Sequence, residues 1–487
     1  MTYLGIDVGT SGVKAILIDR EGKPIGEATA KAMEPLRPHP GWSEQRPIDW
    51  WTATLEAADR LAKDYPKEMA AVRGIGLSGH MHGATLLDRD DKVLRPCILW
   101  NDGRSAAECA EMEAEMPGLR EIAGNIAMPG FTAPKLAWVR KHEPENFERI
   151  AKVLLPKAYV RLLLTGEYVE DMSDAAGTLW LDVGKRDWSD ELLALTGLTR
   201  EQMPRLVEGS ERSAALKPEF VNRWGMSGEV VVAGGAGDNA AAACGIGAIR
   251  PGEGFVSLGT SGVLFVSNDR FRPNTEGAVH AFCHAIPDTW HQMGVILSAT
   301  DSLNWLSRVT GQTPQELSSA AEARFTGPRE EIFLPYLSGE RTPHNNAAAR
   351  GSFVGLSHLS DATLMAQAVM EGVSYAFRDC QRVLSDAGTE IGQLLAVGGG
   401  SKSTLWLKML AANLNCEILL PEDGDYGGAL GVARLGLCAA EGASPEEVMT
   451  MPGIAKVITP DAALVETYSE HYARYRALYP AIEETRT

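Results

Sequence analysis

Residues 4–19 read LGIDVGTSGVKAILID, and residues 255–266 read FVSLGTSGVLFV. The pentapeptide GTSGV therefore occurs twice, each time between two aliphatic or β-branched runs. Such runs joined by a glycine-rich turn are typical of a β-hairpin. Its recurrence in the second half of the chain predicts two related domains. The surroundings differ at one place, because Asp7 precedes the first copy and Ser257 precedes the second.

The length of the chain also favours two domains. A chain of 487 residues exceeds the size that one hydrophobic core usually serves. The position of the repeat places the boundary near Ile249 to Gly252, which gives domains at 1–249 and 250–487. No low-complexity linker occurs there, so we expect the two halves to pack around a cleft.

Strand-like and helix-like patterns alternate along both halves. The patterns predict strands at 3–7, 14–19, 24–30, 72–78 and 394–397, and helices at 361–384 and 403–414. A further helix is expected to begin with Asp49 as its N-cap. This alternation predicts an α/β protein in which helices cover the sheets.

Composition limits the partners and the compartment. The chain has 46 Lys and Arg against 64 Asp and Glu, and its net charge of −18 argues against a nucleic-acid or anionic-membrane surface. Its seven cysteines form no CxxC pair, which favours reduced thiols. The longest small apolar run, 240–249, is too short to span a bilayer. We therefore expect a cytoplasmic protein without a membrane segment.

Glycine-rich turns could hold phosphate groups. Each GTSG turn offers closely spaced backbone N–H groups and hydroxyls, and glycine lets an anion approach the backbone. A single such turn would be read as an ordinary hairpin, but a copy in each half favours a shared polyphosphate. A third turn, GGG at 398–400, lies between a strand and a helix. It lacks the GxGxxG spacing of a dinucleotide site.

Asp238 has two interpretations that the residues alone leave open. It follows the valine strand and glycine turn of VVVAGGAGDNAAAACGIG and opens a helical pattern. Aspartate is a common helix N-cap, which would make Asp238 structural. A carboxylate at a helix N-terminus is also stabilised in its charged form and could accept a proton.

Polar loops suggest a small polar ligand. His80 and His82 follow the strand at 72–78, at the end where ligands of open α/β sheets collect. A zinc site is disfavoured, because no HExxH motif or nearby cysteine pair supplies further ligands. The stretch WNDGR at 100–104 combines an aromatic ring, an amide, a carboxylate and a guanidinium, a mixture that suits a polyol. A solvated turn is the alternative for that stretch.

Taken together, the motifs resemble the FGGY family of carbohydrate kinases along the whole chain. The motifs that carry the resemblance are GIDVGTSGVKA, GHMHGATLLD, ILWNDGR, MPGFTAPKLAWV, DMSDAAGTLWLDV, GGAGDNAAAACGIG, SLGTSGV, FLPYLSGERTPHNN and AVGGGSKSTLW, in that order. The resemblance implies two ribonuclease-H-like domains of the actin and hexokinase ATPase type around an interdomain cleft. It also implies ATP and Mg²⁺.

The resemblance assigns roles to individual residues. Asp238 corresponds to the catalytic base, and Asp7 to a carboxylate needed for activity that acts near Mg²⁺, through water. Met81 and His82 correspond to the sugar-binding pair. Looser assignments to the sugar pocket are Trp100, Asn101, Asp102 and Asn239. The ATP-binding residues implied are Ser11, Gly12, Lys14, Gly259, Thr260, Gly399, Gly400 and Ser403.

The resemblance also implies a phosphoryl acceptor: in the loops GHMHGATLLD and WNDGR the chain resembles glycerol kinases less, which favours a ketose, D-xylulose. A kinase of ribulose, glycerol or gluconate is the nearest alternative. An actin-type ATPase acting as a chaperone or filament would need a client-binding domain, for which the chain has no spare length. The expected partners are the small-molecule ketose and MgATP, and a homodimer is compatible with this interpretation.

Overall fold

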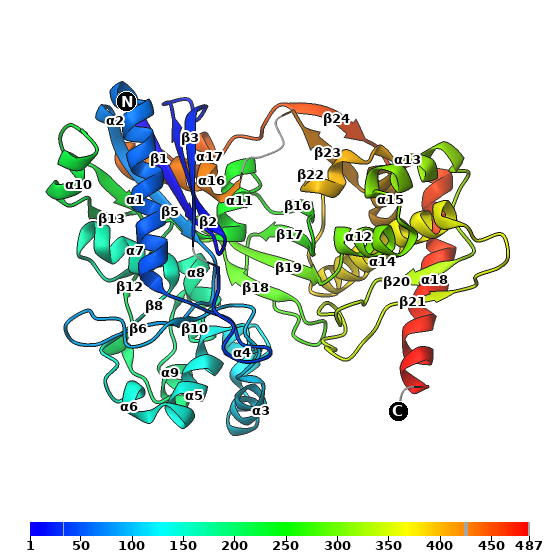
Figure 1. Cartoon of the computed structure of the whole chain (residues 1–487), viewed down its shortest axis with the longest axis horizontal. Coiled ribbons are helices and arrows are strands. Elements are labelled where there is room, and N and C mark those ends of the chain that lie inside the picture. Colours follow the sequence, from blue (N-terminus) through cyan, green and yellow to red (C-terminus); the bar gives the residue numbers. More distant parts are fainter. Residues whose placement is uncertain (33, 423–426, 486–487) are drawn as a thin grey trace.

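A computed structural model describes residues 1–32, 34–422 and 427–485. Two seven-stranded sheets dominate it, one in each half of the chain (Figure 1). Each sheet has helices packed on it, as an α/β architecture requires. The described residues contain no helix that is both long enough and apolar enough to cross a membrane.

The first sheet contains the predicted hairpin and third strand. Its strands run in the order β13-β14-β5-β1-β2-β3, and β15 pairs with the end of β5. Strand β1 is antiparallel to β2 and parallel to β5. The bounds are β1 Thr2–Val8, β2 Gly12–Ile18, β3 Pro24–Lys31, β5 Val72–Gly79, β13 Arg212–Ala215, β14 Val231–Ala233 and β15 Ala236–Gly237. The strands predicted at this end of the chain are therefore confirmed.

The second sheet repeats this plan. Its order is β18-β19-β17-β16-β22-β23-β24, with β16 antiparallel to β17 and parallel to β22. The core orders β3-β2-β1-β5-β14 and β19-β17-β16-β22-β23 thus correspond strand for strand. The bounds are β16 Glu253–Leu258, β17 Gly262–Asn268, β18 His280–Cys283, β19 Trp290–Ile296, β22 Gln393–Val397, β23 Glu417–Pro421 and β24 Ile454–Ile458. The repeated pentapeptide marks the same turn in two related sheets.

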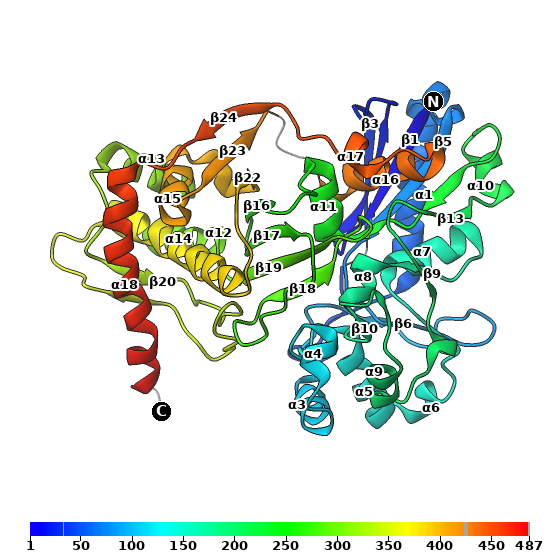
Figure 2. The same ribbon diagram turned by 180° about the vertical axis from the view of Figure 1, so that it is seen from behind.

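Helices from the two halves pack against each other. Helix α16 (Gly427–Glu441) belongs to the second half but lies on the first sheet, where Figures 1 and 2 show it beside β1 and β5. Glycines make this contact possible, because a Cβ on Gly76 would lie 1.8 Å from the carbonyl oxygen of Val432. Helix α11 (Asp238–Ile246) packs against α16 equally closely, since a Cβ on Gly431 would lie 1.8 Å from Ala241 O. The halves therefore share a packed joint between helices.

The first half has further elements besides its sheet. The remaining elements of the first half are β4 Glu44–Gln45, α1 Pro47–Asp64, α2 Pro66–Ala70, β6 Thr85–Leu87, β7 Cys97–Ile98, α3 Ala106–Glu115, α4 Leu119–Ala123, α5 Thr132–His142, α6 Pro144–Phe147, β8 Lys152–Leu154, α7 Pro156–Thr165, β9 Val169–Asp171, α8 Met172–Ala176, β10 Leu181–Asp182, β11 Asp187–Trp188, α9 Asp190–Leu195, β12 Arg205–Val207 and α10 Pro218–Arg223. The prediction that Asp49 caps α1 is wrong, because the helix begins at Pro47, a residue favoured at the first helical position.

Helices of the second half cover its sheet. Their bounds, with those of a small hairpin, are α12 Thr300–Thr310, α13 Pro314–Arg324, β20 Ile332–Leu334, β21 Ser352–Val354, α14 Ala362–Asp386, α15 Thr404–Leu414, α17 Pro445–Val448 and α18 Ala462–Glu484. Asp361 and Ser403 are the side-chain N-caps of α14 and α15, so the two helices predicted here are confirmed. The boundary proposed between 249 and 250 falls between α11 and β16, although α16 returns to the first sheet.

Candidate active site

The two GTSG turns are anchored by different neighbours. In the first turn, Gln45 Nε2 donates to the carbonyl oxygen of Thr10 at 3.0 Å, and Trp100 Nε1 donates to Thr10 Oγ1 at 3.3 Å. In the second turn, the carbonyl oxygen of Gly259 accepts the backbone N–H of Thr300 at 2.9 Å and its hydroxyl at 2.8 Å. Helix α12 therefore begins at the second turn. Hydrogen bonds to neighbouring segments therefore hold both turns in place, which suits loops that present backbone groups to a ligand.

Asp7 and Asp238 lie close enough to influence each other. Asp7 is the last residue but one of β1 and accepts a hydrogen bond from Ser78 Oγ at 2.7 Å. Burial raises the pKa of Asp7, while Ser78 and the charge of Lys14 act in the opposite direction. Burial, together with the negative charge of Asp7, raises the pKa of Asp238 to about 6. A carboxyl group with that pKa is ionised at neutral pH and is also a better proton acceptor than an ordinary aspartate.

The structure places Asp238 in the first turn of α11 but not at its N-cap. Gly237 is the N-cap residue, and Asp238 is the first helical residue. The Asp238 Oδ1 atom accepts the backbone N–H of Asn239 at 2.7 Å and its side-chain amide at 2.8 Å. The side-chain cap that was one interpretation of Asp238 is therefore wrong. Asn239 orients the carboxylate by holding one of its oxygens.

Met81 and His82 lie near the start of α11. A Cβ on Gly237 would lie 3.0 Å from Met81 Sδ, so Met81 packs directly on the residue that precedes Asp238. His82 has a φ of 70°, an unusual backbone conformation for a residue with a side chain. Its Nδ1–H donates to the carbonyl oxygen of Gly177 at 2.6 Å. That tautomer leaves Nε2 as a hydrogen-bond acceptor.

Burial lowers the pKa of His82 to about 3, with a further contribution from the charge of Lys135. The ring is therefore neutral at physiological pH. It lies 5.0 Å from the ring of Phe131 and 6.4 Å from that of Phe282, measured between centroids. Because Phe282 belongs to β18, the second half of the chain contributes to the surroundings of His82.

Two basic residues lie near His82, and the sequence alone assigned neither of them a role. Lys135 is fully buried, and its Nζ donates to the carbonyl oxygens of His82 at 2.7 Å and Gly130 at 2.6 Å. Arg341, from the second half, lies 3.4 Å from His280 Nε2 and contributes to the lowered pKa of His82. Both belong to motifs quoted for the resemblance, but nothing in their spacing distinguishes them from surface cations.

The WNDGR stretch is placed differently from the arrangement suggested by its composition. Trp100 is 49% exposed, and its Nε1 contacts the first GTSG turn. Asp102 is buried, and its two oxygens accept hydrogen bonds from the backbone N–H of Ser43 and from Arg104. Asn101 is exposed. The sugar-binding roles of these three residues stay predictions, and the geometry shows Asp102 supporting the loop.

His80 lies in the packed interior of the first half. It is buried, and its ring lies 5.1 Å from that of Trp50. His280 and His284 lie in and after β18, where both are buried among aromatic rings. These histidines contribute to packing around the site.

A cavity of about 540 Å³ adjoins the third glycine turn. Its lining residues come from α12, α13 and the start of α15, and they are Thr300, Leu303, Asn304, Pro314, Gln315, Ser318, Ser319, Glu322, Gly399, Gly400, Lys402, Ser403 and Trp406. Ser403 Oγ lies 2.8 Å from Ser318 Oγ, so the turn and α13 are joined at the rim. Three of the predicted ATP-binding residues, Gly399, Gly400 and Ser403, line the cavity, and its mixture of apolar and amide side chains suits a purine.

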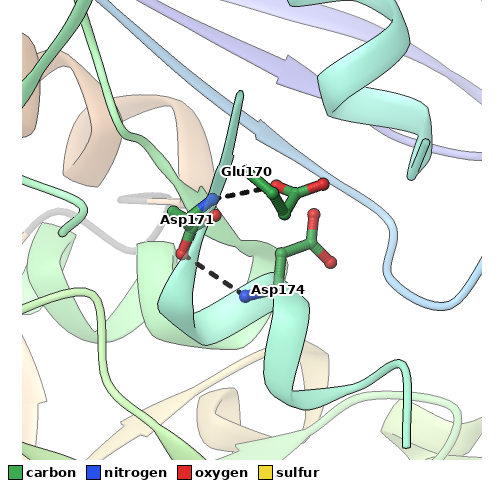
Figure 3. A group of neighbouring side chains, drawn as sticks. All are labelled: Glu170, Asp171 and Asp174. Atoms are coloured by element: carbon green, nitrogen blue, oxygen red, sulfur yellow. Dashed lines mark hydrogen bonds between the residues drawn. The ribbon is translucent and has the colours of Figure 1, made fainter. Parts of the chain in front are cut away.

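A second group of carboxylates lies deeper in the first half. Glu170, Asp171 and Asp174 are the one group of possible metal ligands found within the described ranges, and Figure 3 shows them around α8. The buried amine of Lys157 lies 2.8 Å from Asp171 and 3.4 Å from Asp174, and it also contacts Glu170. Lys157 thus supplies the positive charge that a metal would otherwise supply, so we interpret the group as an ion network.

The fold and these sites define a class of enzyme. Residues 2–245 match the FGGY family of carbohydrate kinases, N-terminal domain, and residues 254–440 match the C-terminal domain of the same family. The chain belongs to the FGGY family of carbohydrate kinases. The predicted resemblance, fold class and type of enzyme are confirmed.

Individual relatives are similar over nearly the whole chain. Xylulose kinase from Escherichia coli K12 is 48% identical over 482 residues, which cover 98% of each protein. A crystal structure from Brucella ovis, described as a xyloylose kinase, is 58% identical and covers 100% of both chains with a TM-score of 0.98. Glycerol kinase from Plasmodium falciparum, 19% identical over 98% of each chain, shares the fold with a TM-score of 0.89.

Proposed function

We propose that the protein transfers the γ-phosphoryl group of MgATP to D-xylulose and forms D-xylulose 5-phosphate. The observation that carries the reaction type is the Asp238 carboxylate at the start of α11, beside Met81 and close to Asp7. The names of the full-length relatives support the sugar. The alternative, a kinase of ribulose, glycerol or gluconate, is not favoured, because the relatives at 46% and 48% identity are named xylulose kinase.

Asp238 acts as the general base in this proposal. Phosphoryl transfer depends mainly on alignment and charge stabilisation, and the base accepts the proton of the attacking sugar hydroxyl. Asn239 holds Oδ1 of Asp238, which leaves the other oxygen to face the hydroxyl. Met81 and His82 bind the sugar, with Nε2 of His82 accepting a hydrogen bond from a sugar hydroxyl. Trp100, Asn101, Asp102 and Asn239 complete the proposed sugar pocket.

The phosphates lie between the two GTSG turns in this account. Ser11, Gly12 and Lys14 contribute from the first half, and Gly259 and Thr260 from the second. The adenosine moiety occupies the 540 Å³ cavity beside Gly399, Gly400 and Ser403.

Asp7 fits a role beside Mg²⁺. The ion prefers oxygen ligands, and two neighbouring carboxylates whose pKa values are raised by burial provide oxygen atoms and a local excess of negative charge. When bound, Mg²⁺ would neutralise charge on the phosphate oxygens. Asp7 would hold it through water, while Ser78 keeps the carboxylate in place.

Replacing Gly399 by Val should raise the KM for ATP by about tenfold or more, while the KM for the sugar changes little. A Cβ at Gly399 would meet no protein atom within 4 Å, so the added side chain fills only space proposed for the nucleotide. Gly392→Val is the matched control, because the nearest atom to its Cβ is 3.7 Å away and it lies outside the cavity. An unchanged KM for ATP in Gly399→Val would contradict the adenosine assignment.

The reaction itself is tested by identifying the product. Purified protein with ATP, Mg²⁺ and D-xylulose should form ADP and one sugar phosphate, and ³¹P and ¹H NMR should place the phosphoryl group on O5. Phosphorylation at another hydroxyl, or ADP release that does not depend on the sugar, would contradict the proposal.

We also propose a cytoplasmic location, to which the seven free, buried cysteines are suited. A homodimer stays a prediction.

A further inference from the structure

The short helix α8 contacts both parts of the proposed catalytic centre. Ser173, its second residue, is completely buried, and its Oγ accepts the backbone N–H of Gly237 at 3.0 Å. Gly237 immediately precedes Asp238. At the other end of the helix, the carbonyl oxygen of Gly177 accepts the hydrogen bond from His82. One five-residue helix therefore fixes the start of α11 and the ring of His82.

The carboxylate of Asp171 determines how the Ser173 hydroxyl points. Ser173 Oγ donates to Asp171 Oδ2 at 2.5 Å, and a hydroxyl group has a single proton to donate. The lone pairs of the same oxygen are therefore directed to the N–H of Gly237. Asp171 Oδ2 also accepts the backbone N–H of Ser173 at 2.8 Å, as the N-cap of α8. The serine is thus held by its backbone and by its side chain.

Lys157 fixes Asp171 from the opposite side. Its Nζ lies 2.8 Å from Asp171 Oδ1, within the group of carboxylates drawn in Figure 3. Burial alone would lower the pKa of this lysine, but the surrounding carboxylates outweigh burial and raise the pKa above its ordinary value. Lys157 therefore stays an ammonium ion. A buried network of paired charges and hydrogen bonds holds its members in one geometry.

We propose that Ser173, held by Asp171 and Lys157, is a positioning residue for Asp238. This inference rests on the proposed function, in which Asp238 is the base. Ser173 acts through the amide of Gly237, which fixes the first turn of α11 and the direction of the Asp238 carboxylate. Loss of the hydroxyl would leave that buried N–H without its partner, and the loop would have to shift to satisfy it. A shift of about 1 Å at a reacting group can reduce the rate by about 10².

The test is a kinetic comparison of Ser173→Ala with a matched variant. Ser173→Ala should lower kcat by about tenfold to a hundredfold, with the KM for ATP changed less than about twofold because the cavity proposed for the nucleotide lies in the second half. Ser267 is equally buried, and its Oγ donates to the carbonyl oxygen of Ala248 at 2.7 Å. Ser267→Ala should lower the Tm to a similar extent and keep the parental kcat. Parental kcat in Ser173→Ala would overturn the inference.

A double mutant shows whether Ser173 acts through Asp238. In an Asp238→Asn background, adding Ser173→Ala should change kcat less than about twofold, because the group being positioned is no longer a base. Full additivity of the two losses would overturn the inference. Asp171→Asn keeps the volume of the carboxylate and carries the same test where Ser173→Ala does not fold. Parental kcat in Asp238→Asn alone would overturn both the proposed base and this inference. A reduced kcat in Asp238→Asn with parental kcat in Ser173→Ala would overturn this inference alone.

Discussion

Asp238→Asn should lose about 10² to 10⁴ in kcat, the range that a positioned general base contributes. Asn preserves the size of the side chain and an oxygen for the Asn239 hydrogen bonds, but it cannot accept the proton of the sugar hydroxyl. The KM values for both substrates should therefore change little. Steady-state rates at high enzyme concentration, with both substrates varied, measure these three quantities.

A control separates this loss from a general effect on helix starts. Asp190 is also the first residue of a helix, α9, and lies outside the proposed site. Asp190→Asn should keep the parental kcat and change the Tm by no more than Asp238→Asn does. Since Gly237 is the N-cap of α11, Asp238→Ala should also cost little stability. Retained turnover in Asp238→Asn would refute the catalytic role.

His82→Asn should lower kcat/KM for the sugar by about tenfold to a hundredfold, the cost of a lost hydrogen bond in a buried site. Asparagine tolerates the left-handed backbone at φ 70°. Its amide can also donate to Gly177 as Nδ1 does. The substitution therefore removes mainly Nε2. The KM for ATP should stay near the parental value.

His82→Ala should reduce sugar use further, because alanine adds backbone strain and leaves the Gly177 carbonyl oxygen unpaired. His344→Asn is a matched control, since His344 is half-buried among tyrosine rings elsewhere in the second half. It should leave kcat/KM for the sugar unchanged. An unchanged value in His82→Asn would remove Nε2 of His82 from the sugar site.

Local patterns were sufficient to predict the hairpin that each of the two sheets contains. Their hairpins are built from adjacent residues, so the alternation around GTSGV determines strand, turn and strand without reference to the rest of the chain. The resemblance then indicated which loops should converge. The N-cap of α1 was misplaced by three residues, at Asp49 instead of Arg46, because Pro47 and Asp49 are both common in a first turn.

Contacts across long stretches of sequence could not be predicted in this way. Ser173 contacts Gly237 across 64 positions of sequence, and Lys135 contacts the carbonyl oxygen of His82 across 53. The return of α16 to that sheet did leave a signal. Glycines inside a strand, such as Gly74 and Gly76, often mark close approach of another backbone, and here that backbone is α16.

The selectivity of the protein for D-xylulose is measured by comparing kcat/KM for a panel of acceptors with MgATP. D-xylulose, D-ribulose, L-ribulose, glycerol and gluconate are compared in one coupled ADP-release assay, with a reaction lacking sugar as the baseline. D-xylulose should have the highest kcat/KM of the panel, and its kcat should fall by about 10² or more in Asp238→Asn. Equal or better turnover of glycerol, or of any other acceptor in the panel, would contradict this selectivity.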